Sequence, residues 1–311
     1  MRYVEPTIET RSVTIEDAVH TVSYYEAPTL LTGVVDEAYD EYDAATVYSV
    51  GTYVKIEALK KKFRCTADGT TAKHPLAYPS AWTDYGPLNS FCMLSTDEFI
   101  DNRTQGSDMV IEIDFSRKDT VSFLDADFLS VQIELIDNST GEVLSVSSYK
   151  GRDFGAGTYA EYYFTEYKTL SRLVIDGLEW LPHSTLRLSF SGAVSIGKLV
   201  SGNSDDLGVT MYGSSLDFED TSKVILSEIT GTRSVLRYGS MRVIEVSLRI
   251  DAADYNVLAN KVEGLIGRNI LFIPTTLDRF AEMITLGYFE TFSLPLDNPA
   301  KIKTSATIIG V

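Results

Sequence analysis

Three runs of residues between positions 106 and 201 alternate apolar and polar side chains with a period of two. Successive side chains of a β-strand point to opposite faces, so this alternation predicts strands with one buried face. The apolar positions of the three runs are Met109, Ile111, Ile113 and Phe115; Val131, Ile133 and Leu135; and Leu186, Leu188 and Phe190. Residues 96–201 are therefore predicted to form an antiparallel β-sandwich of the jelly-roll type.

Residues 42–95 differ in composition and are predicted to form a separate small β module rich in aromatic residues. Tyr53–Ile56 and residues 63–65 favour two short strands. The basic run Lys60, Lys61 and Lys62 between them is expected to be a solvated hairpin tip, where lysines discourage edge pairing. Glycine and proline punctuate the rest of the module, which places its later aromatic residues in loops.

Residues 1–41 are acidic and are predicted to be an N-terminal arm that pairs with the C-terminal domain. Short β-type pieces at residues 10–13 and 20–25 would join a distant sheet. The acidic stretch 36–43 is expected to be a solvated link, because clustered like charges prefer water to a core.

Residues 202–311 are predicted to form an α+β domain. Apolar residues recur at helical spacing only over residues 254–266, where Asp251 or Asp254 would cap the start of a helix and Gly267 its end. Strands are predicted before this helix and after it, around residues 244–250, 270–273, 283–289 and 303–309. The chain as a whole is thus expected to be mainly β.

Length and charge limit the possible functions. A chain of 311 residues is expected to hold more than one domain. Its net charge of −17 argues against a nucleic-acid partner, because such proteins offer Lys and Arg to phosphates. No apolar run is long enough to cross a membrane, and the first residues do not resemble a secretory signal. Cys65 and Cys92 are therefore expected to be reduced and buried.

Catalytic and metal-binding motifs are missing from the sequence, so no enzyme activity, metal or cofactor is expected. His20, His74 and His183 are isolated, and the two cysteines lack the spacing of a zinc site. Glycosidases use two carboxylates about 5 to 9 Å apart. The acidic pairs that could be weighed for this role are Asp125 with Asp127, Glu161 with Glu166, and Asp205 with Asp206. With 44 acidic residues in the chain, such pairs are expected to be solvated surface.

The aromatic residues of the small module are the candidates for binding. A sugar presents a face of C–H groups that can stack on a flat aromatic ring, and Tyr or Trp adds a polar group. The carbohydrate-binding candidates are Trp82, Tyr85, Tyr78 and Tyr53. The alternative is that a module this small needs these rings for its own core.

Two motifs carry a resemblance to known families. The pattern Tyr42, Asp43, Tyr48, Gly51, Val54, Phe63, Pro75 and Trp82 resembles the small chitin-binding-like modules attached to glycoside hydrolases. Its end, Trp82-x-Asp84-x-Gly86-Pro87-x-Asn89, resembles a signature in tail proteins of double-stranded DNA bacteriophages, where such a module is spliced into a larger tail-tip protein. Residues 196–210 resemble a second, glycine-spaced run of similar proteins.

The resemblance implies a non-enzymatic structural component of a bacteriophage tail tip or baseplate, similar to a distal tail protein. Such a protein would belong to the virion tail, be assembled in the host cytoplasm, and form part of a ring as a cyclic homo-oligomer. Its partners would be other tail proteins (tail tube, hub and fibres) and a host surface glycan, with no nucleic acid and no membrane insertion. Two alternatives are a carbohydrate-binding receptor-recognition protein of the virion and a glycan-cleaving enzyme.

Overall fold

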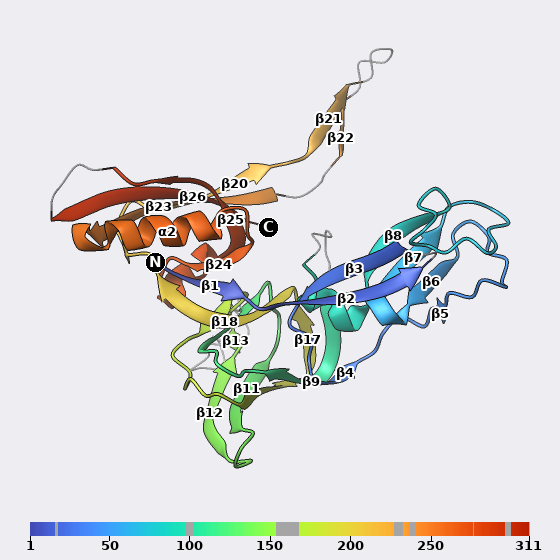
Figure 1. The fold of residues 1–311 in the computed structure, drawn as a ribbon, viewed down its shortest axis with the longest axis horizontal. Helices are drawn as coiled ribbons and strands as arrows, with labels where there is room; N and C mark the ends of the chain where they lie inside the picture. Colours follow the sequence, from blue (N-terminus) through green and yellow to red (C-terminus); the bar gives the residue numbers. More distant parts are fainter. Residues whose placement is uncertain are drawn as a thin grey trace, which may run out of the picture. The chain divides into compact units, whose positions relative to one another are not determined.

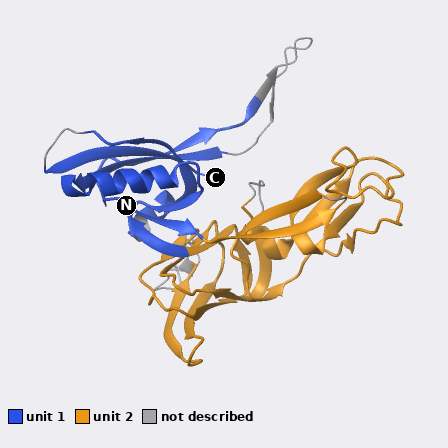
Figure 2. Ribbon diagram, viewed as in Figure 1, with its two compact units in different colours: residues 1–6, 202–311 blue, residues 7–201 orange. Residues whose placement is uncertain are grey.

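The computed structural model describes residues 1–15, 18–96, 103–153, 168–226, 233–236, 240–275, 277–295 and 300–310 (Figure 1). The chain is mainly β with antiparallel sheets and a small C-terminal helix, so the predicted fold class is confirmed. It divides into two compact units (Figure 2). Residues 1–6 and 202–311 form one, here called the terminal unit, and residues 7–201 form the other, the inserted unit.

The inserted unit contains most of the strands. In chain order its elements are β2 (Ile8–Ile15), β3 (Ala18–Tyr25), β4 (Leu30–Val34), β5 (Asp40–Glu41), β6 (Tyr53–Ile56), η1 (Glu57–Leu59), β7 (Lys61–Cys65), β8 (Trp82–Pro87), η2 (Asn89–Leu94), β9 (Thr104–Asp114), β10 (Thr120–Leu124), β11 (Ser130–Asp137), β12 (Val143–Lys150), β13 (Arg152–Asp153), β14 (Lys168–Thr169), β15 (Leu173–Ile175), β16 (Ser184–Ser191) and β17 (Ala193–Ile196).

A six-stranded sheet forms one layer of the sandwich. Its strand order is β12-β11-β16-β9-β17, and β4 also pairs with β9. The three alternating runs of the sequence lie on β9, β11 and β16, and their apolar residues are buried as expected. Phe190 of β16 meets Phe123 of β10 edge to face at 5.6 Å between ring centroids, so the buried face of this sheet packs against the β10–β15 layer.

The N-terminal strands differ from the prediction. The pieces expected to join a distant sheet are parts of β2 and β3, which pair with each other in a two-stranded sheet, with Ile8 opposite Tyr25 and Ile15 opposite Ala18. That prediction is wrong because a partner strand three residues away closes a hairpin with little loss of chain entropy. Only Arg2–Pro6, which form β1, belong to the terminal unit.

The terminal unit is built around one long sheet. Its elements are β1 (Arg2–Pro6), the second half of β18 (Lys198–Asp206), β19 (Val209–Thr210), β20 (Ser215–Asp220), β21 (Lys223–Leu226), β22 (Arg233–Leu236), β23 (Ser240–Asp251), η3 (Ala252–Asp254), α2 (Tyr255–Leu265), β24 (Ile270–Ile273), η4 (Asp278–Met283), β25 (Thr285–Ser293) and β26 (Lys301–Gly310). Within this unit the order of the paired strands is β18-β1-β24-β25-β26-β23-β19, and β20 also pairs with β23.

Helix α2 forms where the periodicity predicted a helix, and it packs on this sheet. Leu258, Val262 and Leu265 are buried in one core with apolar residues of β23 and β26. Gly267 follows the helix with φ +78°, the left-handed conformation expected there. The predicted aspartate cap is wrong. Neither Asp251 nor Asp254 makes a side-chain cap bond, because the η3 turn runs into α2 and its Ala252 carbonyl accepts the Tyr255 N–H.

Candidate functional site

The four-stranded sheet β5-β6-β7-β8 holds most of the aromatic residues proposed for binding. Its inner face packs into the core of the inserted unit. Trp82 lies there with 2% of its surface exposed, and its indole N–H donates to the Lys73 carbonyl at 2.8 Å. The Tyr48 ring meets the indole edge to face at 5.1 Å. Trp82 is therefore a core residue in this structure, which is the alternative considered for it, and offers no free face to a sugar.

The outer face of the same sheet carries one exposed tyrosine, Tyr85, and two half-buried ones, Tyr39 and Tyr53. Tyr53 and Tyr85 meet edge to face at 5.0 Å between ring centroids, and Tyr39 stacks on Tyr53 at 5.2 Å and 17°. The Arg64 guanidinium lies over the Tyr53 ring, 5.8 Å from its centroid. Register explains this grouping, since Arg64 pairs directly with Tyr53 across β6 and β7. We call Tyr39, Tyr53, Arg64 and Tyr85 the tyrosine–arginine face.

Exposure and charge set this face apart from the core. Tyr85 has 48% of its surface exposed, although it lies on strand β8 and not in the expected loop. A side-chain hydrogen bond with Tyr85 raises the pKa of Tyr53 above its usual value. Among the described residues, no carboxylate pairs with Arg64, whereas the neighbouring Lys55 and Lys62 are paired with Glu57 and Glu37.

The structure brings together two of the four predicted residues, Tyr53 and Tyr85. Tyr78 packs against the core of the inserted unit and is only partly exposed, with no ring contact to that pair among the described residues. Tyr39 and Arg64 were missed. The period of two could have identified Arg64. Alternate residues of a strand share one face, so Tyr53 and Lys55 lie on one face of β6, and Lys62 and Arg64 lie on one face of β7.

The lysine run is not a solvated tip, which corrects that prediction. Lys60 takes a left-handed conformation (φ +52°) after η1, and the strand β7 begins at Lys61. Lys61 is only 8% exposed, and its ammonium group binds Asp84 at 2.8 Å. Because Asp84 lies on the paired strand β8, this ion pair joins two neighbouring strands.

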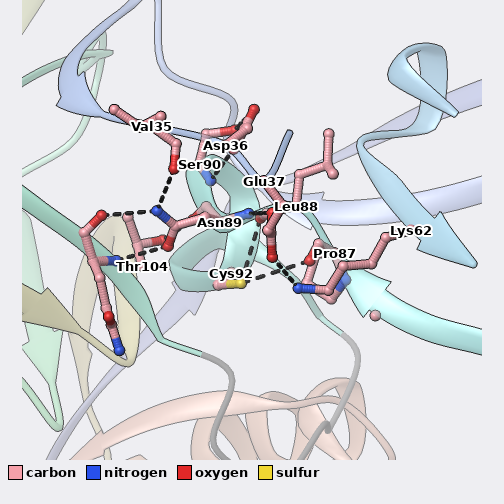
Figure 3. Close-up of polar contacts among 12 residues, drawn as sticks. Val35, Asp36, Glu37, Lys62, Pro87, Leu88, Asn89, Ser90, Cys92 and Thr104 are labelled. Atoms are coloured by element: carbon pink, nitrogen blue, oxygen red, sulfur yellow. Dashed lines mark hydrogen bonds and ion pairs between the residues drawn. The ribbon is translucent and has the colours of Figure 1, made fainter. Parts of the chain in front are cut away.

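Each polar residue of the phage-like signature has a structural contact. The Asp84 carboxylate accepts the Gly86 N–H at 2.9 Å, and Gly86 has φ +99°, which glycine adopts without steric cost. The Asn89 amide donates to the carbonyls of Val35 and Gln105 at 2.9 and 2.8 Å (Figure 3). Its oxygen accepts the Gln105 N–H at 2.8 Å. The signature therefore ties β8 and η2 to two other segments of the inserted unit.

The acidic stretch at residues 36–43 was expected to be a solvated link, and its first two residues instead cap η2 (Figure 3). Asp36 accepts the Ser90 N–H at 2.7 Å, and Glu37 accepts the Asn89 N–H at 3.1 Å. The first N–H groups of a helical turn lack partners within the turn, so carboxylates are favoured there. Burial raises the pKa of Glu37, but hydrogen bonds from Lys62 and the Asn89 backbone outweigh it and hold the pKa below its usual value.

Cys65 and Cys92 are buried and form no disulfide, as expected. Cys92 lies next to the η2 cap, 3.4 Å from the Leu88 carbonyl, and burial raises its pKa to about 11. Among the described residues, no group of His, Cys, Asp and Glu side chains is arranged to hold a metal ion. Within the same residues, no helix is long and apolar enough to cross a bilayer.

Two of the acidic pairs weighed for glycan cleavage contain a carboxylate bound to a cation. Asp125 accepts from Arg172 at 3.1 Å, and Asp205 pairs with Lys261 at 2.7 Å. The third pair, Glu161 and Glu166, lies outside the described residues. Neither described pair neighbours the tyrosine–arginine face in sequence or in its sheet.

The terminal unit has a pocket of about 510 Å³. Segments around β1, β19, β24 and η4 line it, and the lining includes Val209, Tyr212, Leu277 and Phe280. All four are exposed, and Tyr212 is 99% exposed. Four exposed, largely apolar side chains thus border one pocket of the terminal unit.

No model of a known protein family matches the chain, and no curated protein and no solved structure matches it significantly. Its class is therefore defined by its own architecture, a mainly β protein of two units with an exposed tyrosine–arginine face.

Proposed function

We propose that the chain is a non-enzymatic structural component of a bacteriophage tail tip or baseplate. In this proposal the terminal unit forms part of a ring, as a cyclic homo-oligomer, and the inserted unit supplies accessory β modules. Its partners are the tail tube, hub and fibre proteins of the virion.

The observation that carries this proposal is the way the inserted unit interrupts the terminal unit. The chain leaves after β1 and returns through β18, and these strands pair antiparallel with Pro6 opposite Gly202. Gly202 belongs to the second phage-like run, and a Cβ there would lie 2.4 Å from the Glu5 carbonyl oxygen. An accessory domain placed between two paired strands leaves the sheet around it intact, which suits a module spliced into a tail protein.

Two features of the terminal unit support assembly with other chains. Strands β21 and β22 pair only with each other among the described residues, and an isolated two-stranded hairpin is marginally stable without further packing. The pocket that contains Val209, Tyr212, Leu277 and Phe280 adds an exposed apolar surface. Both suit contacts with a neighbouring protein.

Light scattering across a concentration range tests the ring. We expect a mass that rises to a fixed multiple of 34.4 kDa, and negative-stain images of closed rings. The variant Tyr212→Ser is expected to lower the association constant, and Tyr85→Ser, the same change at an exposed tyrosine of the inserted unit, is expected to leave it unchanged. A strict monomer at every concentration would contradict the self-assembling ring.

The second candidate function is carbohydrate binding during recognition of the host surface, and the tyrosine–arginine face favours it. One exposed and two half-buried tyrosines gather there outside the hydrophobic core. The binding test is a glycan array, with Tyr85→Ala expected to lose binding and Trp180→Ala, which removes an exposed ring of the same unit, expected to keep it. Absence of binding to every glycan would exclude this candidate and leave the ring proposal untouched.

A further inference from the structure

Arg64 is an unusual residue for its position. The chain has a net charge of −17, and the other cations on the outer face of its sheet, Lys55 and Lys62, are each held by a carboxylate. Arg64 is exposed, lies against Tyr53 and has no carboxylate partner among the described residues. An exposed guanidinium without an ion pair, on a strongly acidic protein, is free to bind an anionic ligand.

The three tyrosines divide their roles by geometry. Tyr53 is the centre, because its ring contacts Tyr39, Tyr85 and the Arg64 guanidinium. These contacts hold the guanidinium beside the rings and support Tyr85. Tyr85 is the outermost ring, with 48% of its surface exposed and an interplanar angle of 73° to Tyr53. It is therefore the ring with surface left for a ligand.

A planar guanidinium matches the two oxygens of a carboxylate and binds them with paired hydrogen bonds. A tyrosine ring beside it offers a flat apolar surface for the C–H face of a sugar. A ligand that uses both must combine a saccharide ring with a negative charge. A neutral sugar would use the ring alone and leave the guanidinium without a partner.

We propose that the tyrosine–arginine face binds an acidic saccharide, with a pyranose stacked on Tyr85 and its carboxylate bound by Arg64. This inference rests on the carbohydrate-binding candidate function and adds the chemical class of the ligand. Tyr53 and Tyr39 act as positioning residues that fix the guanidinium next to the stacking ring.

The test uses the full chain and pairs of probes that differ only in charge. Oligogalacturonate, oligomannuronate and a sialylated oligosaccharide are each compared with their own methyl esters by calorimetry. We expect binding of at least one acidic probe, with its ester about tenfold weaker, as loss of one charge-assisted contact predicts. Arg64→Gln should weaken the acid about tenfold and leave the ester unchanged.

Two control variants separate a specific effect from a general one. Tyr85→Ala should weaken the acid and the ester alike, because stacking does not depend on the charge. Arg187→Gln removes another guanidinium of the inserted unit, one already bound to Glu112 and Glu134, and should change neither affinity. Unchanged urea midpoints in all variants verify that the fold is intact.

Equal affinity for acid and ester, or unaltered binding of the acid by Arg64→Gln, would overturn the inference that the ligand is acidic. The protein would then still bind a saccharide, but without a contact to its charge. No binding of any probe, acidic or esterified, would overturn the inference. A glycan array that is also empty would overturn the carbohydrate-binding candidate as well.

Discussion

Removal of the Asn89 side chain tests whether the phage-like signature stabilises the fold. Asn89→Ala deletes three hydrogen bonds, to the carbonyls of Val35 and Gln105 and from the Gln105 N–H. Each such bond contributes about 0.5–1.5 kcal/mol net, and water can replace some of them at this partly exposed position. We therefore expect the free energy of unfolding of the inserted unit to fall by about 2 kcal/mol, a shift of about 1 M in the urea midpoint.

Tryptophan fluorescence is a suitable readout, because both tryptophans, Trp82 and Trp180, lie in the inserted unit. Asn138→Ala is the matched control. Its side chain accepts one exposed hydrogen bond from Thr185, so its loss should cost no more than about 0.5 kcal/mol. If Asn89→Ala destabilises the unit no more than Asn138→Ala, the reasoning about the three bonds is refuted.

The remaining predictions concern the core and the titratable groups of the inserted unit. Trp82→Ala should lower the free energy of unfolding of this unit by about 3–5 kcal/mol, measured in urea titrations followed by circular dichroism. A decrease below about 1 kcal/mol, as expected for a surface residue, would contradict the core position of Trp82. Because the pKa of Glu37 is lowered in the folded state, its stabilisation should be present above its ordinary pKa of 4.5 and disappear as the pH falls through the folded value. Urea midpoints of the wild type and Glu37→Gln should thus differ at pH 6 and converge toward pH 3, and a constant difference would refute the linkage. Cys92 is buried and its pKa is raised to about 11, so a thiol reagent at pH 8 should label it only in urea. The variant Cys65→Ala leaves Cys92 as the one cysteine, and rapid labelling of this variant in its native state would contradict the burial of Cys92.

Regular patterns allowed much of the fold to be predicted from the sequence. The alternation at Met109, Ile111 and Ile113 identified a half-buried strand, and the spacing of Leu258 and Val262 identified α2. Both patterns are local, because they depend only on the period of the element and on one face being buried.

The side chains of the candidate site were harder to predict. The sequence placed both Trp82 and Tyr85, three residues apart on β8, among the binding candidates. Three residues along a strand reverse the face, so one ring packs into the core and the other stays exposed. The face assigned to each ring depends on strand register, and a bulge between β7 and β8 shifts that register.

Charged residues depended most on partners distant in the sequence. The run that contains Lys61 and the stretch that contains Asp36 and Glu37 both suggested solvated segments. Lys61 is bound by Asp84 on the next strand. The N–H groups at the start of η2 bind the carboxylates of Asp36 and Glu37. Local charge density carries no information about such partners.

The sequence by itself determined the fold class, the strands of the sandwich and helix α2, because these follow from hydrophobic periods within each segment. Only the tertiary structure decided that residues 7–201 are inserted between two paired strands, and that Tyr39, Tyr53, Arg64 and Tyr85 share one exposed face. These arrangements depend on the pairing of segments far apart in the chain, and that pairing is set by packing and register rather than by any local pattern.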